Sequence, residues 1–140
     1  MRVVLDTNVL LSALISPHGH PDTIYRAWRT ARFEIVTSVT QLDGLRRASR
    51  YEKFKTILQP HRVGAMVNNL QRAVVLAQLP ADIEADDLFD AFLLAMALVG
   101  EADYLVTGDH RAGLLQRAHF NRTRIVTPAG FCAEALLQAR

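Results

Sequence analysis

The amino-acid sequence predicts an α/β fold, a three-layer α/β/α sandwich around a central, mostly parallel sheet. Short runs of β-branched and apolar residues alternate along the chain with longer stretches of helical periodicity. This alternation is typical of parallel sheets with both faces covered by helices. With 140 residues, half of them hydrophobic, the chain is sized for one compact domain with a sizeable core, residues 1–140.

The first part of the chain contains one expected strand and two expected helices. "RVVLD" (2–6) is β-branched and apolar up to its aspartate, which predicts a short buried strand. The run "VLLSALI" (9–15) predicts a helix that ends near Pro17. "SPHGHPD" predicts a loop, and Asp22 at its end is suited to cap a helix over 23–32.

The middle of the chain repeats the strand-then-helix pattern. "FEIVTS" (33–38) predicts a second strand, and Ser38 or Thr40 then starts a helix that runs through Phe54. A further helix and a third strand are expected at 61–72 and 73–80.

The last part of the chain completes the alternation. "DLFDAFLLAMALVG" (87–100) predicts a helix that is buried over most of its length, and "ADYLVTGD" (102–109) predicts a fourth strand. "RIVTP" (124–128) predicts a fifth strand before a terminal helix.

Charge is segregated along the sequence, although the net charge is only +2. The chain has eleven Lys and Arg against five acids up to Arg72, but eight acids against one base from Ala73 to Arg111. Such segregation favours an acidic site beside a basic surface.

Composition also excludes several classes of protein. The single cysteine, Cys132, rules out an internal disulfide and a multi-cysteine zinc site, and we expect it in the core. The first residues do not resemble a signal peptide, and no apolar stretch is long enough to span a membrane. We therefore expect a soluble, cytoplasmic protein with no membrane partner.

Three aspartates are the candidate catalytic residues. Asp6 and Asp109 end two predicted strands, and Asp90 lies near the start of a predicted helix. In a parallel α/β sheet, ligands bind at the carboxyl ends of the strands, where loops and helix N-termini meet. These three acids, which are distant in sequence, are therefore expected to converge in space.

Converging carboxylates repel one another unless a cation lies between them, so this pattern predicts a metal site. Oxygen-only ligands favour Mg²⁺ or Mn²⁺ over zinc, which prefers His or Cys. Such ions lower the pKa of bound water and bind phosphodiester oxygens during in-line attack.

A structural role for the same residues stays open at this point. An aspartate at a strand end is often the N-cap of the next helix, and Asp87 is suited either to cap a helix or to hold a metal-bound water. Thr7, Asn8 and Thr107 are expected to support the acids by hydrogen bonding, although turn chemistry also explains them.

A basic stretch follows the second predicted strand. Arg46, Arg47 and Arg50 are the candidate RNA-binding residues, with Tyr51 and Phe54 interleaved. Arginines can follow a phosphate backbone while an aromatic ring stacks on a base. The alternative is a solvated helix face with both rings packed inward.

The chain lacks the sequence motifs of several other enzyme classes. A haloacid-dehalogenase-type phosphatase needs a second Asp two residues after Asp6, where this chain has Asn8. No "GxGxxG" or "GxxxxGK" follows the first strand, and no "GxSxG" is present.

The chain resembles the PIN domain family, in particular the VapC-like PIN toxins of bacterial toxin–antitoxin modules. "VVLDTNVLLSAL" resembles the first motif, "DLFDAFLLAMALVGEADYLVTGD" the paired third and fourth motifs, and "RIVTPAGFCAEAL" the closing strand and helix. The resemblance implies a metal-dependent endoribonuclease that forms a homodimer and binds a cognate antitoxin protein. By position, the motifs correspond to Asp6, Asp90 and Asp109.

One position departs from the family pattern. Similar toxins carry a Glu on the helix after the second strand, in a run like "LDELRRV", whereas this chain reads "LDGLRRA" with Gly44 at that place. The neighbouring Asp43 is turned by about 100° along a helix, so it substitutes only if the backbone shifts. The alternative hypothesis is therefore a catalytically impaired PIN-like protein that binds RNA or an antitoxin without cleavage.

Overall fold

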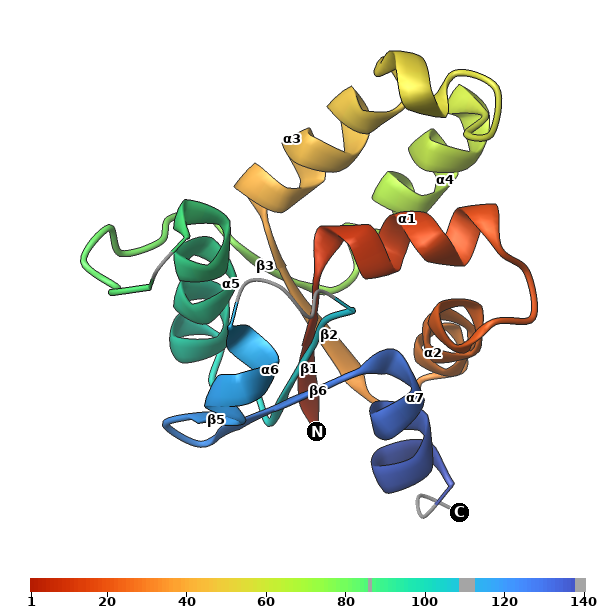
Figure 1. The fold of residues 1–140 in the computed structure, drawn as a ribbon. Coiled ribbons are helices and arrows are strands. Elements are labelled where there is room, and N and C mark those ends of the chain that lie inside the picture. The colour runs from red at the N-terminus through yellow and green to blue at the C-terminus, as the bar shows by residue number, and fades with distance from the viewer. Residues whose placement is uncertain (86, 109–112, 138–140) are drawn as a thin grey trace.

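The computed structural model describes residues 1–85, 87–108 and 113–137 (Figure 1). A six-stranded sheet has the order β3-β2-β1-β4-β6-β5. Its strands are β1 (Arg2–Leu5), β2 (Glu34–Ser38), β3 (Val74–Leu76), β4 (Tyr104–Val106), β5 (His119–Phe120) and β6 (Thr123–Val126). All neighbouring strands are parallel except β5 and β6. The prediction of a mostly parallel sheet is confirmed.

Helices follow most of the strands. They are α1 (Thr7–Ile15), α2 (His20–Arg29), α3 (Val39–Ala48), α4 (Pro60–Leu70), α5 (Leu88–Val99), α6 (Leu114–Arg117) and α7 (Pro128–Phe131). A 3₁₀ turn spans Glu52–Phe54, and a π-helical turn, Cys132–Leu136, continues α7.

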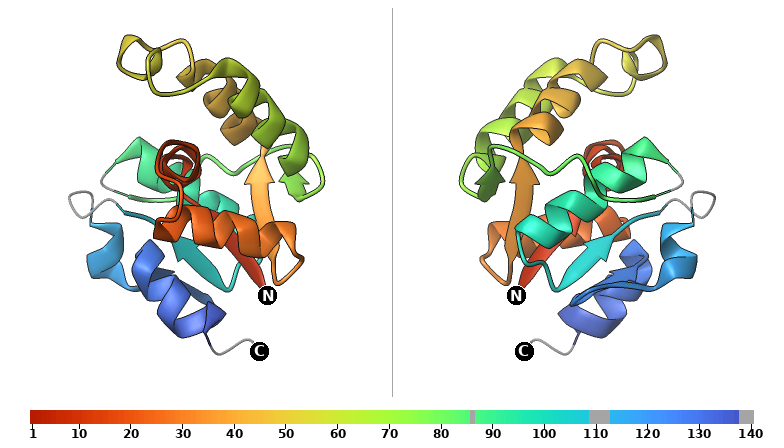
Figure 2. Two further views of the ribbon diagram at one scale, coloured as in Figure 1. Left: turned by 90° about the vertical axis from the view of Figure 1, so that its right-hand side faces the viewer. Right: turned by 90° about the vertical axis from the view of Figure 1, so that its left-hand side faces the viewer.

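The two faces of the sheet pack into two separate hydrophobic clusters. Val3 and Leu5 of β1 belong to one cluster, whereas Val4 between them belongs to the other, as the two-residue period of a strand requires. The first cluster includes side chains of α1, α2, α3, α4 and α7, and the second includes those of α5 and α6. These helix layers make the predicted three-layer α/β/α sandwich (Figure 2).

Helices α3 and α4 extend past the carboxyl ends of the strands. Figure 2 shows the pair beyond the end of β2, above the rest of the molecule. Their apolar faces still belong to the first cluster, through Leu42 and Leu45 of α3 and Met66 of α4. The pair therefore forms a projecting arm next to the edge where the sheet's loops meet.

The helix expected to run through Phe54 ends earlier, at Ala48. The Ser49 hydroxyl donates to the Arg46 carbonyl at 3.2 Å, a local bond that competes with helix continuation. Tyr51 is then extended (φ −73°, ψ 137°), and Glu52–Phe54 forms only a 3₁₀ turn.

Several other boundaries differ from the sequence-based expectation. Helix α2 begins at His20, with Gly19 rather than Asp22 as its N-cap. The expected third and fourth strands shorten to Val74–Leu76 and Tyr104–Val106. Strand β5 was not expected, because two residues carry no readable periodicity.

Charged residues line the amino edge of the sheet, where the parallel strands begin. The Arg2 N–H and the Arg122 guanidinium donate to the two oxygens of Asp103 at 2.8 and 2.7 Å. The Arg124 Nε donates to both oxygens of Glu134, at 2.9 and 2.8 Å. These pairs tie the beginnings of β1, β4 and β6 to their surroundings.

Among the described residues, no helix is long and apolar enough to cross a membrane.

Candidate functional site

Asp6 lies at the carboxyl end of β1 and is 2% exposed. Its Oδ1 accepts a hydrogen bond from the Asn8 N–H at 3.1 Å, so Asp6 is the N-cap of α1. Its Oδ2 accepts from the Thr107 hydroxyl at 2.8 Å, and its own N–H donates to the Val106 carbonyl at 2.9 Å. The carboxylate is therefore fixed between the ends of β1 and β4.

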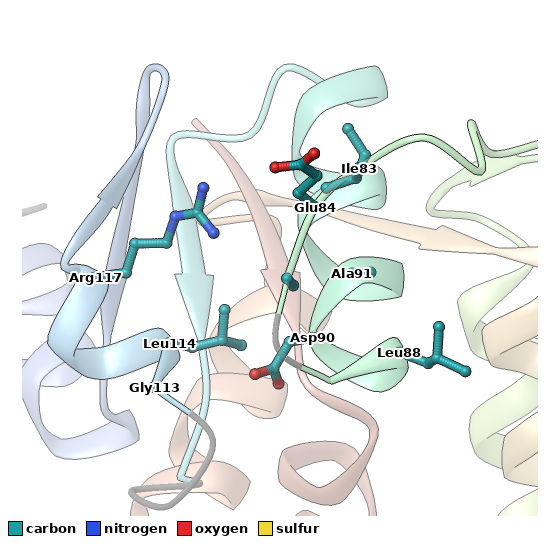
Figure 3. A pocket seen from close by; sticks show the side chains of 9 residues that line it. Ile83, Glu84, Leu88, Asp90, Ala91, Gly113, Leu114 and Arg117 are labelled. Atoms are coloured by element: carbon teal, nitrogen blue, oxygen red, sulfur yellow. The ribbon is translucent and has the colours of Figure 1, made fainter.

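Asp90 lies in the first turn of α5 and is 4% exposed. Asp87 caps this helix, because its Oδ1 accepts from the N–H groups of Phe89 at 2.6 Å and Asp90 at 3.3 Å. Figure 3 shows the Asp90 carboxylate pointing from α5 toward Gly113 and Leu114, into a pocket of about 710 Å³. Capping thus orients the turn that carries the buried acid.

The first turns of α1 and α5 line one groove at the carboxyl edge of the sheet. Thr7 and Asn8, next to Asp6, line the same groove as Asp87 and Leu88. Leu88 also lines the pocket that contains Asp90. The structure thus brings Asp6 and Asp90 to one edge, whereas Asp109 lies outside the described residues.

The donors at this edge suit a hard divalent cation. Asp6 and Asp90 are buried carboxylates, and a buried charge is costly unless it is compensated. Asp6 lies beside the Thr107 hydroxyl and Asn8, so the side-chain donors offer oxygen rather than sulfur or imidazole. Within the described part of the chain, no group of three or more His, Cys, Asp and Glu forms a metal cluster.

Gln41 is a residue of this edge that the sequence analysis missed. Its Nε2 donates to the Leu5 carbonyl at 2.8 Å and to the Thr7 hydroxyl at 3.3 Å. Its Oε1 accepts from the Thr37 hydroxyl at 2.6 Å. The sequence carries only a weak indication of this role. Gln41 lies four residues before Leu45, so helical spacing places it on the buried face of α3.

A groove of about 930 Å³ is lined by residues of α1, α3 and α5, including Asn8 and Asp87 near the two acids. Besides the first turns of α1 and α5, the lining residues include Gly44 and Arg47 of α3, and Tyr51 and Lys53 beyond it. A Cβ built on Gly44 would meet no atom within 4 Å. The absence of a side chain at this position therefore leaves open space at the groove.

The three candidate RNA-binding arginines occupy different surroundings. Arg47 lines the groove, whereas Arg46 forms an ion pair with Asp43 at 3.0 Å. Arg50 is exposed just past the end of α3. Asp43 is thus engaged on the helix surface and does not line the groove.

Comparisons with known proteins identify a family and two similar folds. A family model described as "PIN domain" matches residues 2–111. The fold is similar to that of VapBC2 from Rickettsia felis bound to a DNA fragment from their promoter, with 17% identity, a TM-score of 0.58, and coverage of 91% of this chain and 98% of that chain. It is also similar to FitAB bound to an IR36 DNA fragment, with 13% identity, a TM-score of 0.57, and coverage of 90% and 94%. No curated protein sequence matches the chain.

Proposed function

Because this chain belongs to the PIN domain family, we propose that it is a metal-dependent endoribonuclease that hydrolyses single-stranded RNA. The observation that carries the proposal is the pair of buried carboxylates, Asp6 and Asp90, at the carboxyl edge of the sheet. Ligands of open parallel sheets bind at this edge. PIN domains are generally nucleases, so the family and the site support the same chemistry.

In this proposal Asp6 is a direct metal ligand. The hydrogen bonds from Thr107 and Asn8 hold its two oxygens in place before the ion arrives. Such outer partners preserve the geometry of a ligand and strengthen metal binding. The bond from Thr107 also joins β4 to β1 at the point where the ion would bind.

Asp90 is the second acid of the proposed site, and Asp109 is the expected third. Asp87 fixes the first turn of α5 and so sets the direction of the Asp90 side chain. Asp87 lines the groove beside the site, where its second carboxylate oxygen can also orient water.

Mg²⁺ or Mn²⁺, when bound, would supply the positive charge that acidifies water and stabilises the phosphodiester during hydrolysis. In this proposal, Asp6, Asp90 and Asp109 would hold the ion at the carboxyl edge of the sheet. Burial of Asp6 and Asp90 in a low-dielectric edge strengthens their interaction with any cation.

We further propose that the protein is the toxin of a toxin–antitoxin pair. The likeness of its fold to VapBC2 and FitAB supports a VapC-like assignment. A cognate antitoxin protein, a homodimeric state and a cytoplasmic location are parts of the same proposal.

A second candidate function follows from Gly44. The family pattern places a Glu at this position, and this chain has open space there instead. A site with one acid fewer binds cations more weakly, which favours an impaired nuclease that binds RNA or an antitoxin without cleavage.

The decisive experiment compares the parent chain with Gly44→Glu and Asp6→Asn. Calorimetric titration with Mg²⁺ and Mn²⁺ measures metal binding, and a mixed-sequence single-stranded RNA measures cleavage. We expect the parent to bind metal and cleave RNA, and Asp6→Asn to lose at least about 100-fold in cleavage, because loss of even an outer-shell partner costs about 10–100-fold. Asn remains a good N-cap, so the Asp6→Asn fold should persist.

Two other results would contradict the proposed function. If only Gly44→Glu binds metal and cleaves RNA, the parent is an impaired nuclease and the binding function replaces the catalytic one. If neither chain binds metal or cleaves RNA, the nuclease proposal is wrong for this protein.

A further inference from the structure

The groove between α3 and α5 gathers aromatic side chains that the proposed chemistry does not use. Tyr51 and Phe54 line it after α3, and Phe89 and Phe92 line it on α5. We call this the aromatic groove. It opens at Asn8 and Asp87, the neighbours of the proposed catalytic acids.

Several large apolar side chains of this groove are exposed to solvent. Tyr51 is 51% exposed, Phe89 is 43% exposed and Leu88 is 91% exposed. Exposed apolar groups scattered singly are ordinary, but their concentration at one concave surface indicates a binding site. The side chains that a ligand would contact are therefore already in place.

The aromatic rings are also held in pairs. The centroids of Tyr51 and Phe54 are 6.4 Å apart in a stacked arrangement, and those of Phe89 and Phe92 are 6.0 Å apart in a tilted one. Phe54 and Phe92 are partly buried against the two hydrophobic clusters, and each supports the more exposed ring of its pair. Support of this kind lowers the entropy cost of binding to Tyr51 and Phe89.

Two cations accompany the rings. Arg47 lines the groove and forms no ion pair with any described acid. Lys53 also lines it, with its Nζ 5.0 Å from the centroid of the Phe54 ring. Cations beside exposed rings are the combination that binds single-stranded nucleic acids, where the backbone meets charge and the bases stack.

The groove has room for such a ligand because Gly44 contributes no side chain to it. Pockets of about 300–1,000 Å³ hold drug-sized ligands, and this groove measures about 930 Å³. A glutamate at position 44 would project toward this space and add negative charge near the phosphates.

We propose that the aromatic groove binds unpaired bases of single-stranded RNA, with Tyr51 and Phe89 stacking on bases and Arg47 and Lys53 contacting phosphates. The inference rests on the proposed function and deepens it, because it assigns substrate recognition to side chains outside the acidic site. A strand in the groove reaches Asp6 and Asp90 through the end formed by Asn8 and Asp87. Stacking tolerates any base, so recognition favours unpaired over paired RNA more than one sequence over another.

The test measures binding separately from cleavage. Fluorescence anisotropy of an end-labelled, mixed-sequence RNA decamer is recorded in EDTA at low salt, for the parent chain and for Tyr51→Ala and Phe89→Ala. Each alanine variant should weaken binding about tenfold, whereas Tyr51→Phe keeps its ring and should bind like the parent. Leu98→Ala, an exposed apolar position of α5 outside the groove, is the matched control and should change nothing.

Two further measurements test the assigned contacts. Arg47→Ala should lower the slope of log K against log salt by about 1, as expected for one lost phosphate contact. The same decamer annealed to its complement should bind more weakly than the single strand, because its bases are already stacked.

The outcomes separate this inference from the proposed nuclease activity. If the alanine variants weaken RNA binding while no chain cleaves RNA with Mg²⁺ or Mn²⁺, the groove assignment stands and the nuclease proposal fails. If the parent cleaves RNA and the alanine variants bind like the parent, the groove assignment is wrong. If the parent does not bind the decamer, the assignment is also wrong, and a protein segment becomes the better occupant of the groove.

Discussion

The two edges of the sheet use acidic side chains in opposite ways. At the amino edge, Asp103 and Glu134 pair with arginines of the same chain, Arg122 and Arg124. At the carboxyl edge, Asp6 is held by the Thr107 hydroxyl and the Asn8 N–H. At the amino edge, acidic side chains form ion pairs that join the strands to their surroundings. At the carboxyl edge, hydrogen bonds instead orient a carboxylate toward a site where a ligand can bind.

The pKa shifts at the amino edge agree with this structural role. Partial burial acts to raise the pKa of Asp103, but hydrogen bonds from the Arg2 N–H and the Arg122 guanidinium outweigh it and lower the pKa below its ordinary value. The hydrogen bond from Arg124 likewise lowers the pKa of Glu134. Both acids are thus more readily ionised in the folded protein than in the unfolded chain.

The largest expected difference between the two edges is in metal affinity and RNA cleavage, and it is tested by replacing two buried threonines. The Thr107 hydroxyl donates to Asp6 at the carboxyl edge, and the Thr123 hydroxyl donates to the Ala102 carbonyl at 2.7 Å near the amino edge. Replacing either with valine removes one buried hydrogen bond and should lower the free energy of unfolding by about 1 kcal/mol. Thr107→Val should also lower metal affinity and RNA cleavage by about 10–100-fold, because Asp6 loses a group that orients it.

Calorimetry with Mn²⁺ and steady-state cleavage check this positioning role. Thr107→Ser restores the hydroxyl and should recover most of the metal affinity. Equal losses of metal affinity in Thr107→Val and Thr123→Val would show that the effect is one of stability alone.

Two glycines, one near each edge, test the packing of the two edges through stability alone. Gly100 ends α5, where its carbonyl accepts from the Arg2 guanidinium at 3.1 Å. A Cβ there would lie 2.5 Å from the Val36 Cγ1 and 3.0 Å from the Met96 carbonyl oxygen. Gly100→Ala should therefore lower the free energy of unfolding by about 1–3 kcal/mol.

Gly44→Ala is the matched substitution at the carboxyl edge. Its Cβ would meet no atom within 4 Å, and alanine is favoured over glycine within a helix, so stability should rise by about 0.5–1 kcal/mol. Urea unfolding measures both variants. A loss of stability in Gly44→Ala would contradict the open space found beside α3.

The smallest expected effect is the pH dependence of the free energy of unfolding that Asp103 contributes. A lowered pKa means that the Asp103 carboxylate stabilises the fold above its ordinary pKa of 3.8, and that this contribution is lost as the pH falls through the folded-state value. Asp103→Asn should thus cost up to about 1 kcal/mol at pH 7, because Arg122 is largely exposed and the pair is screened. The difference from the parent should shrink as the pH falls below 3.8.

Urea unfolding at several pH values checks this sign. Asp43→Asn breaks an exposed ion pair on one turn of α3 and should cost no more than about 0.5 kcal/mol. A difference between Asp103→Asn and the parent that grows toward low pH would contradict the proposed role of the amino edge.

Much of the fold was predictable from local patterns. The β-branched runs at Arg2–Leu5 and Glu34–Ser38 and the apolar helix at Leu88–Val99 were located within a few residues. Boundaries were less predictable where a side chain competes with the backbone, as Ser49 does at the end of α3. Strand β5 was missed because its pairing with β6, rather than its composition, defines it.

The candidate site was predictable in one respect and not in another. That Asp6 and Asp90 share an edge follows from the topology of parallel strands, which the alternation of elements indicated. The hydrogen bonds of Gln41 were not foreseeable, because they join β1, β2 and α3 through a side chain that resembles an ordinary helix residue.

The sequence by itself therefore determined the α/β/α class, the order of the main elements and the edge at which the acids lie. Hydrophobic periodicity sets which face each segment buries, and that information is local. The tertiary structure alone decided that Thr107 holds Asp6 across 101 positions and that Tyr51 and Phe89 line one groove. These contacts depend on how α3 and α5 pack around the end of β1, which no local pattern encodes.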